Sequence, residues 1–369
     1  MGQIEHEPER ACVRAPNWVG DVVMATPAFR ALRSGLPKAH ISLVVRRRVA
    51  PVLRGAPWFD QVITYDPEGR WAPGEFVRCA RALRTPRREL GLLLPNSLSS
   101  ALMFRLAGVR RRVGYKRDCR SVLLTDAVPR PSEGGRFKPT YMVDYYLRLC
   151  ERAGLEVAGR RMELFFSDED AGRAQQVLRR QGVAPDESLH LLHPGAGYGP
   201  SKRWPAERFA RLAGMLSSEF GAKVAVIGGP AEQAAARAIQ RQSSGEVTNL
   251  IDCGIDLHLL KCVVARSGLL VTTDSGPRHY GVALGVPTVC VMGPTHPAYS
   301  TSDLPNDRVV RLDVECGPCQ RKVCPLDHRC MEDISARMVF DACAEAIACL
   351  LYTSPSPRDL STPRMQSSA

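Results

Sequence analysis

The sequence predicts an α/β protein built from two doubly wound domains. Three observations lead to this prediction. Strand-like and helix-like segments alternate along the first half of the chain, and the same alternation returns in the second half. This rhythm is typical of parallel sheets flanked by helices. The length of 369 residues also suits two domains of ordinary size better than a single core.

The elements follow one another in a regular order. In the first half we expect strands at 11–15, 40–45, 61–65 and 91–94, with helix-like segments at 22–36 and 49–55. In the second half we expect strands at 189–192, 223–227, 269–272 and 288–292. Helix-like stretches at 141–153 and 168–181 lie between the halves, so we place the domains at 1–184 and 185–333 with the boundary near Pro185. Such folds bind ligands at the carboxyl ends of their strands, so the site should lie in the cleft between the domains.

Composition describes a globular protein with an excess of positive charge. The chain is 44% hydrophobic and 24% charged, with a formal net charge of +12 and a pI near 9.3. This charge favours anionic partners, although a GC-rich genome also enriches arginine. Residues 1–10 lack the apolar segment of a signal peptide, and no stretch is long enough to span a bilayer, so we expect a cytosolic protein with mostly reduced cysteines.

The segment from Thr273 to His279 has the outline of an anion-binding turn. An apolar strand ends there, and the following helix directs free N–H groups and its positive dipole end at the cleft. Gly276 allows close approach of a ligand, while Ser275 and His279 share a helical face. Asp274 or Ser275 could equally serve as a simple helix cap. The remaining motifs must decide between these interpretations.

The first strand-to-helix turn, residues 16–21, carries a candidate general base. Asp21 stands at the start of a helix that faces the predicted cleft, whereas the G-x-G-x-x-G of a dehydrogenase is absent. The alternative is a first-turn acid stabilised by the helix dipole.

Two further turns suit a nucleotide. The opening strand of the second half leads to His193 and then to Lys202 and Arg203, a combination that suits a diphosphate, although a solvated basic loop is the alternative. The next strand leads to Glu232, which could accept hydrogen bonds from ribose or act as an ordinary first-turn acid. No Walker loop is present.

One short segment is rich in cysteine. Its spacing opens with C-x-x-C, which suits a metal clip, but the remainder matches no standard zinc pattern. Either a metal site or a set of reduced structural thiols therefore fits Cys316, Cys319, Cys324 and Cys330.

Taken together, these motifs resemble glycosyltransferase family 9, the ADP-heptose:lipopolysaccharide heptosyltransferases. The resemblance rests on residues 17–21, 193–195 with 202–205, and 274–277 with His279, and it extends from about residue 11 to about residue 350. The tryptophan-bearing first turn is most similar to the heptosyltransferase II branch. Two segments depart from the usual family pattern. The first strand carries Arg10, Cys12 and Arg14 where the family is usually more apolar, and Arg278 with Tyr280 flanks the histidine.

The resemblance implies a GT-B architecture, with two Rossmann-like domains facing each other across a cleft, and an inverting transfer without a metal ion or other cofactor. It implies that the N-terminal domain holds the acceptor, with Asn17, Trp18 and Gly20 at the cleft and Asp21 as the catalytic base. The ADP-heptose donor would be held by Lys202, Glu232, Asp274, Ser275, Gly276 and His279. A last helix at 334–351 would cross back to the N-terminal domain, and residues 352–369 form a tail that we expect to be disordered and foreign to the natural protein.

The expected reaction adds L-glycero-D-manno-heptose to the heptosyl-Kdo-lipid A inner core of lipopolysaccharide, at the cytoplasmic face of the inner membrane. Heptosyltransferase I, another GT-B transferase or a sugar-nucleotide epimerase are alternatives. A non-catalytic nucleotide-binding or nucleic-acid-binding protein fits less well, because an acid stands at the cleft and aromatics make up only 6% of the chain. We therefore expect no nucleic-acid partner.

Overall fold

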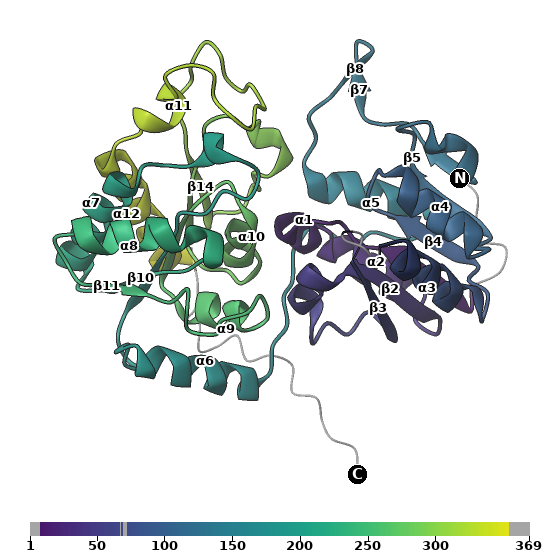
Figure 1. Cartoon of the computed structure of the whole chain (residues 1–369), viewed down its shortest axis with the longest axis horizontal. Coiled ribbons are helices and arrows are strands. Elements are labelled where there is room, and N and C mark those ends of the chain that lie inside the picture. The colour runs from purple at the N-terminus through teal and green to yellow at the C-terminus, as the bar shows by residue number, and fades with distance from the viewer. Residues whose placement is uncertain (1–7, 67, 69–71, 354–369) are drawn as a thin grey trace.

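The computed structural model describes residues 8–66, 68 and 72–353. It contains two α/β domains that lie side by side and are joined by a linker along one edge (Figure 1). The first sheet comprises β1 (Arg10–Arg14), β2 (His40–Arg46), β3 (Gln61–Tyr65), β4 (Leu90–Leu93), β5 (Arg111–Tyr115) and β6 (Asp126–Val128). The second comprises β9 (Leu189–His193), β10 (Lys223–Val226), β11 (Val247–Asn249), β12 (Leu269–Thr273), β13 (Thr288–Val291) and β14 (Asp307–Val310).

Both sheets are parallel and share one topology. The first has the order β3-β2-β1-β4-β5-β6, and the second has the order β11-β10-β9-β12-β13-β14. The strand order reverses beside β1 and beside β9, and ligands of such sheets bind at this switch point. The predicted fold class is thereby confirmed. The central strands are buried on both faces, as their continuous apolar runs predict.

Helices cover both faces of each sheet. In the first domain they are α1 (Val19–Met24), α2 (Thr26–Gly35), α3 (Ala72–Arg84), α4 (Leu98–Leu106) and α5 (Met142–Ala153), with the 3-10 helices η1 (Arg47–Leu53) and η2 (Arg120–Leu123). The later helices are α6 (Asp168–Arg180), α7 (Ala206–Phe220), α8 (Gln233–Gln242), α9 (Leu259–Arg266), α10 (Gly276–Ala283), α11 (Arg329–Glu332) and α12 (Ala336–Thr353), with η3 (Pro200–Lys202), η4 (Pro230–Glu232) and η5 (Pro297–Tyr299).

The single helix expected at 22–36 is two helices. It breaks at Ala25, and α2 begins with Pro27 in its first turn. Proline has no N–H and favours the start of a helix, so the chain restarts there instead of continuing α1. As a result α1 is short, and it lies at the carboxyl edge of the first sheet.

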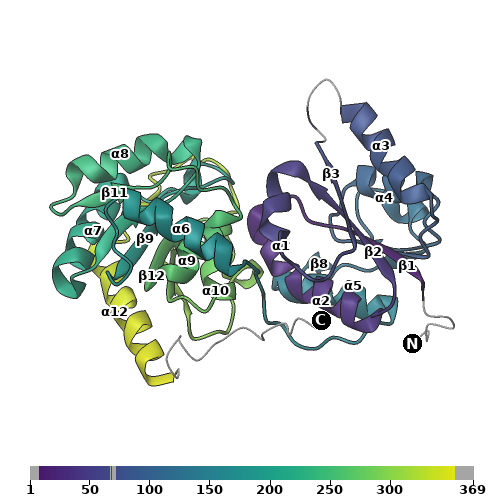
Figure 2. The same cartoon turned by 90° about the horizontal axis from the view of Figure 1, so that it is seen from below.

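The final helix does not cross back to the first domain as expected. Helix α12 packs on α7, β13 and β14, and Figure 2 shows it beside the second domain. Its buried side chains Val339, Cys343 and Ala346 belong to the apolar core of that domain, which explains why the helix stays there. The helix reaches Thr353, and residues 354–369 of the predicted tail lie outside the described residues.

A buried lysine joins the two domains on the linker side. Lys261, on α9, donates hydrogen bonds to the carbonyls of Arg54 (2.8 Å) at the end of η1 and of Phe165 (2.5 Å) in the linker. Burial lowers the pKa of Lys261 to about 8. Helix α6 also packs on α9, where Asp170 lies 2.9 Å from His258.

A small hairpin bridges the domains on the opposite side. It consists of β7 (Ser132–Glu133) and β8 (Arg136–Phe137). The ring of Phe137 stacks on Tyr299 of the second domain with 6.2 Å between the centroids. Figure 1 shows the hairpin at the end of the interdomain boundary farthest from α6 and α9.

Candidate active site

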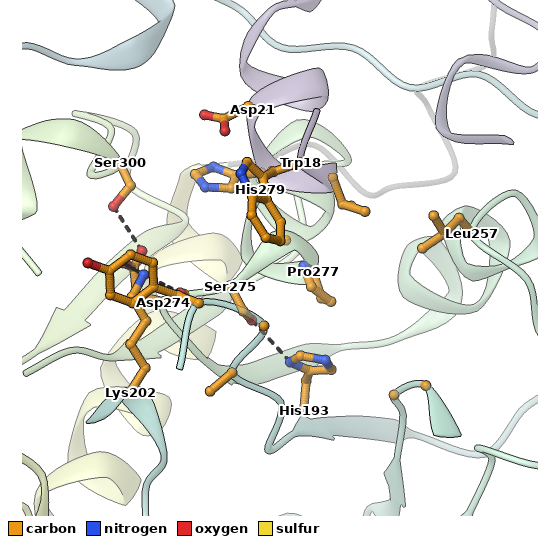
Figure 3. Close-up of a pocket in the computed structure, with 18 of the residues that line it drawn as sticks. Trp18, Asp21, His193, Lys202, Leu257, Asp274, Ser275, Pro277, His279 and Ser300 are labelled. Atoms are coloured by element: carbon orange, nitrogen blue, oxygen red, sulfur yellow. Dashed lines mark hydrogen bonds and ion pairs between the residues drawn. The ribbon is translucent and has the colours of Figure 1, made fainter. Parts of the chain in front are cut away.

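A cavity of about 980 Å³ lies between the domains, at the carboxyl ends of both sheets. Figure 3 shows residues of both domains facing into it. The first domain contributes residues of α1 together with Arg48 and Met142. The second contributes the turns after β9, β10 and β12, so four of the motifs identified in the sequence meet at the predicted interdomain site. From the predicted set the lining includes Trp18, Gly20, Asp21, Lys202, Glu232, Asp274, Ser275, Gly276 and His279.

Helices α1 and α10 touch through glycine. A Cβ atom on Gly20 would lie 2.8 Å from Cδ2 of His279, and one on Gly276 would lie 2.8 Å from Cγ1 of Val19. These distances are shorter than real Cβ contacts, so any larger residue would push the helices apart. The glycines therefore permit the close approach that brings Asp21 to face the α10 turn across the cavity (Figure 3).

Asp21 is half-buried in the first turn of α1. Burial raises its pKa to about 6, and nearby Asp274 acts in the same direction. A hydrogen bond from the Tyr146 hydroxyl on α5 and the charge of Lys202 oppose this rise. A carboxylate with a pKa near 6 is ionised at neutral pH yet basic enough to accept a proton, which suits a general base.

Tyr146→Phe tests how this carboxylate is tuned. Loss of the hydroxyl removes a donor that stabilises the ionised form, so we expect the Asp21 pKa to rise further. The acidic limb of the kcat/KM profile should move to higher pH, while the rate on its upper plateau changes less. Profiles of wild type and variant from pH 5 to 9 measure this shift. An unchanged limb would show that Tyr146 does not influence the base.

Lys202 is anchored by Asp274 across the turn. Its ammonium lies 2.6 Å from Oδ2 of Asp274 and 3.0 Å from that residue's carbonyl, and 4.9 Å from the ring centroid of Tyr198. Both anchoring bonds go to one residue, so one of the three ammonium protons is left for a ligand. This arrangement fixes a positive charge at the cavity wall.

Asp274 itself is held by four donors. Burial alone would raise its pKa, but the charges of Lys202 and Arg278 hold that pKa far below its usual range. Thr295 (2.7 Å) and Ser300 (2.9 Å) also donate to the carboxylate. A carboxylate so fully engaged positions Lys202, and its charge would repel a phosphate that contacted it directly.

Arg278 links Asp274 to a second buried carboxylate. Its fully buried guanidinium forms a two-point ion pair with Asp307, at 2.9 Å for each bond. It also lies 3.5 Å from Asp274. The arginine that departs from the family pattern thus stabilises the turn, and neither Arg278 nor Asp307 was expected to do so.

Ser275 and His279 occupy the two ends of the first turn of α10. The Ser275 hydroxyl is 3.1 Å from Nδ1 of His193 and 3.0 Å from Thr272. Burial lowers the pKa of His279 to about 4, so its ring is neutral at pH 7. Its Nδ1 is buried without a hydrogen-bond partner among the described residues. The neutral ring lines the cavity beside Gly20.

Glu232 lines the cavity at the turn that follows β10. Its carboxylate accepts a hydrogen bond from the Gly229 N–H at 2.8 Å. A Cβ on Gly195 would meet Cδ of Glu232 at 3.0 Å, so the carboxylate packs directly against the loop after β9. The acid therefore caps its own turn, as one of the two interpretations expected, and it also lines the cavity.

Two expected residues are not part of the cavity. Asn17 is not among the lining residues, because its side-chain oxygen accepts a 2.6 Å hydrogen bond from the buried Arg14. Arg203 is exposed outside the lining. In the described parts of the chain, no group of three or more His, Cys, Asp or Glu side chains is arranged to hold a metal ion. The Cys330 thiol packs on Gly293.

The cysteine-rich loop has a different role in the fold. It lies against the segment that carries Lys202: the Ser201 hydroxyl donates to the carbonyl of Arg321 at 2.6 Å, and the Tyr198 hydroxyl donates to that of Gln320 at 2.5 Å. Gln320 and Lys322 also line the cavity. The loop therefore supports the cavity wall that carries Lys202. The two segments are more than 100 residues apart in the sequence, so no local signal revealed this contact.

Comparison with known proteins agrees with this geometry. The family model described as glycosyltransferase family 9 (heptosyltransferase) matches residues 76–329. The chain belongs to glycosyltransferase family 9. It is therefore a glycosyltransferase, and its two facing Rossmann-like domains are the GT-B fold.

Among curated members of family 9, lipopolysaccharide heptosyltransferase 2 of Salmonella typhimurium is 29% identical over 310 residues, covering 81% of this chain and 87% of that protein. Lipopolysaccharide heptosyltransferase 2 of Escherichia coli is 28% identical over 314 residues, with the same coverage. The solved structure of Escherichia coli ADP-heptose LPS heptosyltransferase II has a TM-score of 0.76 at 25% identity, covering 92% of this chain and 99% of that chain. A family 9 glycosyltransferase from Veillonella parvula superposes with a TM-score of 0.79 at 23% identity, covering 92% and 97%.

Proposed function

We propose that this family 9 glycosyltransferase moves L-glycero-D-manno-heptose from ADP-heptose to the heptosyl-Kdo-lipid A inner core of lipopolysaccharide. One observation carries the proposal: Asp21 on the first domain faces Lys202 and the α10 turn of the second domain across a single cavity. A base and an anion site placed on opposite sides are what a direct displacement at the sugar requires. The heptosyltransferase 2 names of the relatives support the choice of donor and acceptor.

In the proposed reaction Asp21 accepts the proton of an acceptor hydroxyl while that oxygen forms a bond to the anomeric carbon. The bond from that carbon to the diphosphate oxygen breaks on the opposite face, so the configuration inverts and ADP leaves. The leaving diphosphate gains negative charge, which Lys202 and the N–H groups at the start of α10 stabilise. These groups supply the positive charge without a divalent cation.

The remaining cavity residues receive roles from their positions. We assign Glu232 to the ribose hydroxyls, and Ser275, Gly276 and His279 to the sugar and diphosphate. Trp18 stands at the mouth, 55% exposed, with the Arg48 guanidinium carbon 5.4 Å from its ring centroid. This aromatic and cationic pair is suited to an anionic core sugar, so we place the acceptor there.

A lipid-linked acceptor places the enzyme at the cytoplasmic face of the inner membrane as a peripheral protein. Within residues 8–66, 68 and 72–353, none of the helices is both long and apolar enough to cross a bilayer. The net charge of +12 supports attraction to anionic lipid.

The test is a transfer assay with cores truncated at different points. Purified protein is incubated with ADP-heptose and with acceptors bearing no heptose, one heptose or two, and products are weighed by mass spectrometry. We expect a gain of one heptose on the mono-heptosyl core. Labelling of the heptose-free core would indicate heptosyltransferase I instead, and transfer from other nucleotide sugars but not ADP-heptose would contradict the proposal.

A further inference from the structure

Helix α4 is apolar on its outer face as well as its inner face. Its inner side chains, Ala101, Met103 and Phe104, are buried in the core of the first domain. Its outer face carries Leu98 and Leu106, which are 50% and 56% exposed. A surface helix of a globular protein normally exposes polar residues on that side. The outer face of α4 instead exposes apolar side chains to water.

The exposed leucines form a stripe that continues onto a neighbouring turn. Leu98, Leu102 and Leu106 are spaced by four residues and therefore share one face of the helix. Val122 of η2, which packs beside α4, is 87% exposed. We call Leu98, Leu102, Leu106 and Val122 the leucine face. Contiguous exposed apolar side chains of this kind mark an interaction surface.

The charges around the leucine face are almost all positive. Seven lysine or arginine residues but only one acid, Asp118, lie between Leu98 and Thr125. Several of the arginines are engaged by carbonyls or carboxylates, but Arg105, Arg110 and Lys116 are exposed. On the adjacent side the exposed Arg87 donates to the carbonyl of Gly108, just beyond the end of α4. Apolar side chains bordered by free cations match the interface of a bilayer that contains anionic lipid.

The leucine face is also placed suitably for a membrane-held substrate. Helix α4 begins five residues after β4 ends, so its first turn lies at the carboxyl edge of the sheet that also carries Asp21. Figures 1 and 2 show α3 and α4 on the side of the first domain that faces away from the second domain. Lipid contact there leaves both the cavity and the second domain free.

We infer that the leucine face and its bordering arginines dock this enzyme on the surface of an anionic bilayer. The leucines enter the headgroup region and the arginines bind lipid phosphates. Binding then depends both on burial of the leucines and on attraction of the cations to lipid phosphate. A purely electrostatic attraction of the whole basic protein would not depend on the leucines. The functional reason for this contact rests on the proposed lipid-linked acceptor. The binding to vesicles can be measured whether or not that proposal holds.

The test is flotation of the full chain with vesicles of phosphatidylethanolamine and phosphatidylglycerol, or of phosphatidylcholine alone. We expect wild type to bind the anionic vesicles and to stay free of the neutral ones. Leu98→Gln, Leu102→Gln and Leu106→Gln combined should weaken the anionic binding about tenfold or more, since three partly inserted side chains are lost. Arg105→Gln, Arg110→Gln and Lys116→Gln combined should weaken it and reduce its dependence on salt.

The matched control replaces three apolar residues of the second domain that are exposed to a similar extent. Its substitutions are Leu304→Gln, Leu326→Gln and Met338→Gln. It should bind like wild type. Equal binding by the leucine variant, or equal loss in the control, overturns the inference. Thermal unfolding followed by circular dichroism checks that each variant folds, and the variant lacking the three cations tests the surface independently of helix packing. Transfer to a deacylated, water-soluble acceptor should be unchanged by the leucine variant, so a failure of docking is distinguished from a failure of the proposed activity.

Discussion

Asp21→Asn should lower kcat/KM by about 100- to 10,000-fold, because a positioned base contributes about that much to the rate. The amide has nearly the same shape but cannot take the acceptor proton. We expect ADP to bind with little change, because Lys202 and the α10 turn remain in place. Steady-state kinetics give the rate and calorimetry gives the affinity for ADP.

The pH dependence separates loss of the base from a general defect. Wild-type kcat/KM should fall as pH drops below about 6, because protonation of Asp21 removes the base, and should level off above it. The residual kcat/KM of Asp21→Asn should not show this decrease at low pH. Asp256→Asn is a suitable control, since Asp256 also lines the cavity but its carboxylate caps α9 through the N–H of Leu259 at 2.8 Å. Near-normal turnover of Asp21→Asn would refute the assignment.

Lys202→Met should reduce kcat by about 100- to 1,000-fold, which is the usual effect of removing one donor that stabilises charge developing in the transition state. Methionine keeps the length of the side chain but not its charge. Binding of ADP-heptose should also weaken, because the diphosphate loses its fixed cation. Asp274 keeps three donors, so the fold should survive, which thermal unfolding can check.

The neighbouring lysine provides the comparison for this variant. Lys322 also lines the cavity, and its ammonium lies 5.9 Å from the ring centroid of Tyr198, but no carboxylate anchors it in the described structure. Lys322→Met should therefore have a smaller effect. Excess chelator should leave wild-type transfer undiminished, and added magnesium should not rescue Lys202→Met. Dependence of the wild type on magnesium would contradict a mechanism in which Lys202 supplies the positive charge.

Much of the fold could be predicted because parallel strands buried on both faces appear as continuous apolar runs. The strands β2, β3 and β9 coincide with the predicted segments to within one residue. The strands β5 and β14 were missed because Arg111 and Arg308 interrupt the apolar pattern. These arginine side chains are only partly buried, so they give no signal of a core strand. The backbone is extended there because it pairs with a neighbouring strand.

The site was predictable where a motif lies in a strand-to-helix turn, since topology alone brings such turns to one edge. Asp21, Lys202 and His279 entered the cavity for this reason. Asn17 did not, because its side chain turns to a buried arginine in the adjacent strand. Tyr146 was missed because it lies on the buried face of helix α5, and only tertiary packing directs its hydroxyl at Asp21.

Lys261 determines where the two domains can separate. Its buried ammonium is held by carbonyls of η1 and of the linker, and breaking such bonds to a charged group costs about 1.5–3 kcal/mol each. A rotation of the domains is least costly when it keeps this edge intact and widens the opposite edge, where Phe137 meets Tyr299. Lys261 thus ties the two domains together at this edge, and we expect the ring contact between Phe137 and Tyr299 to break first when the domains separate.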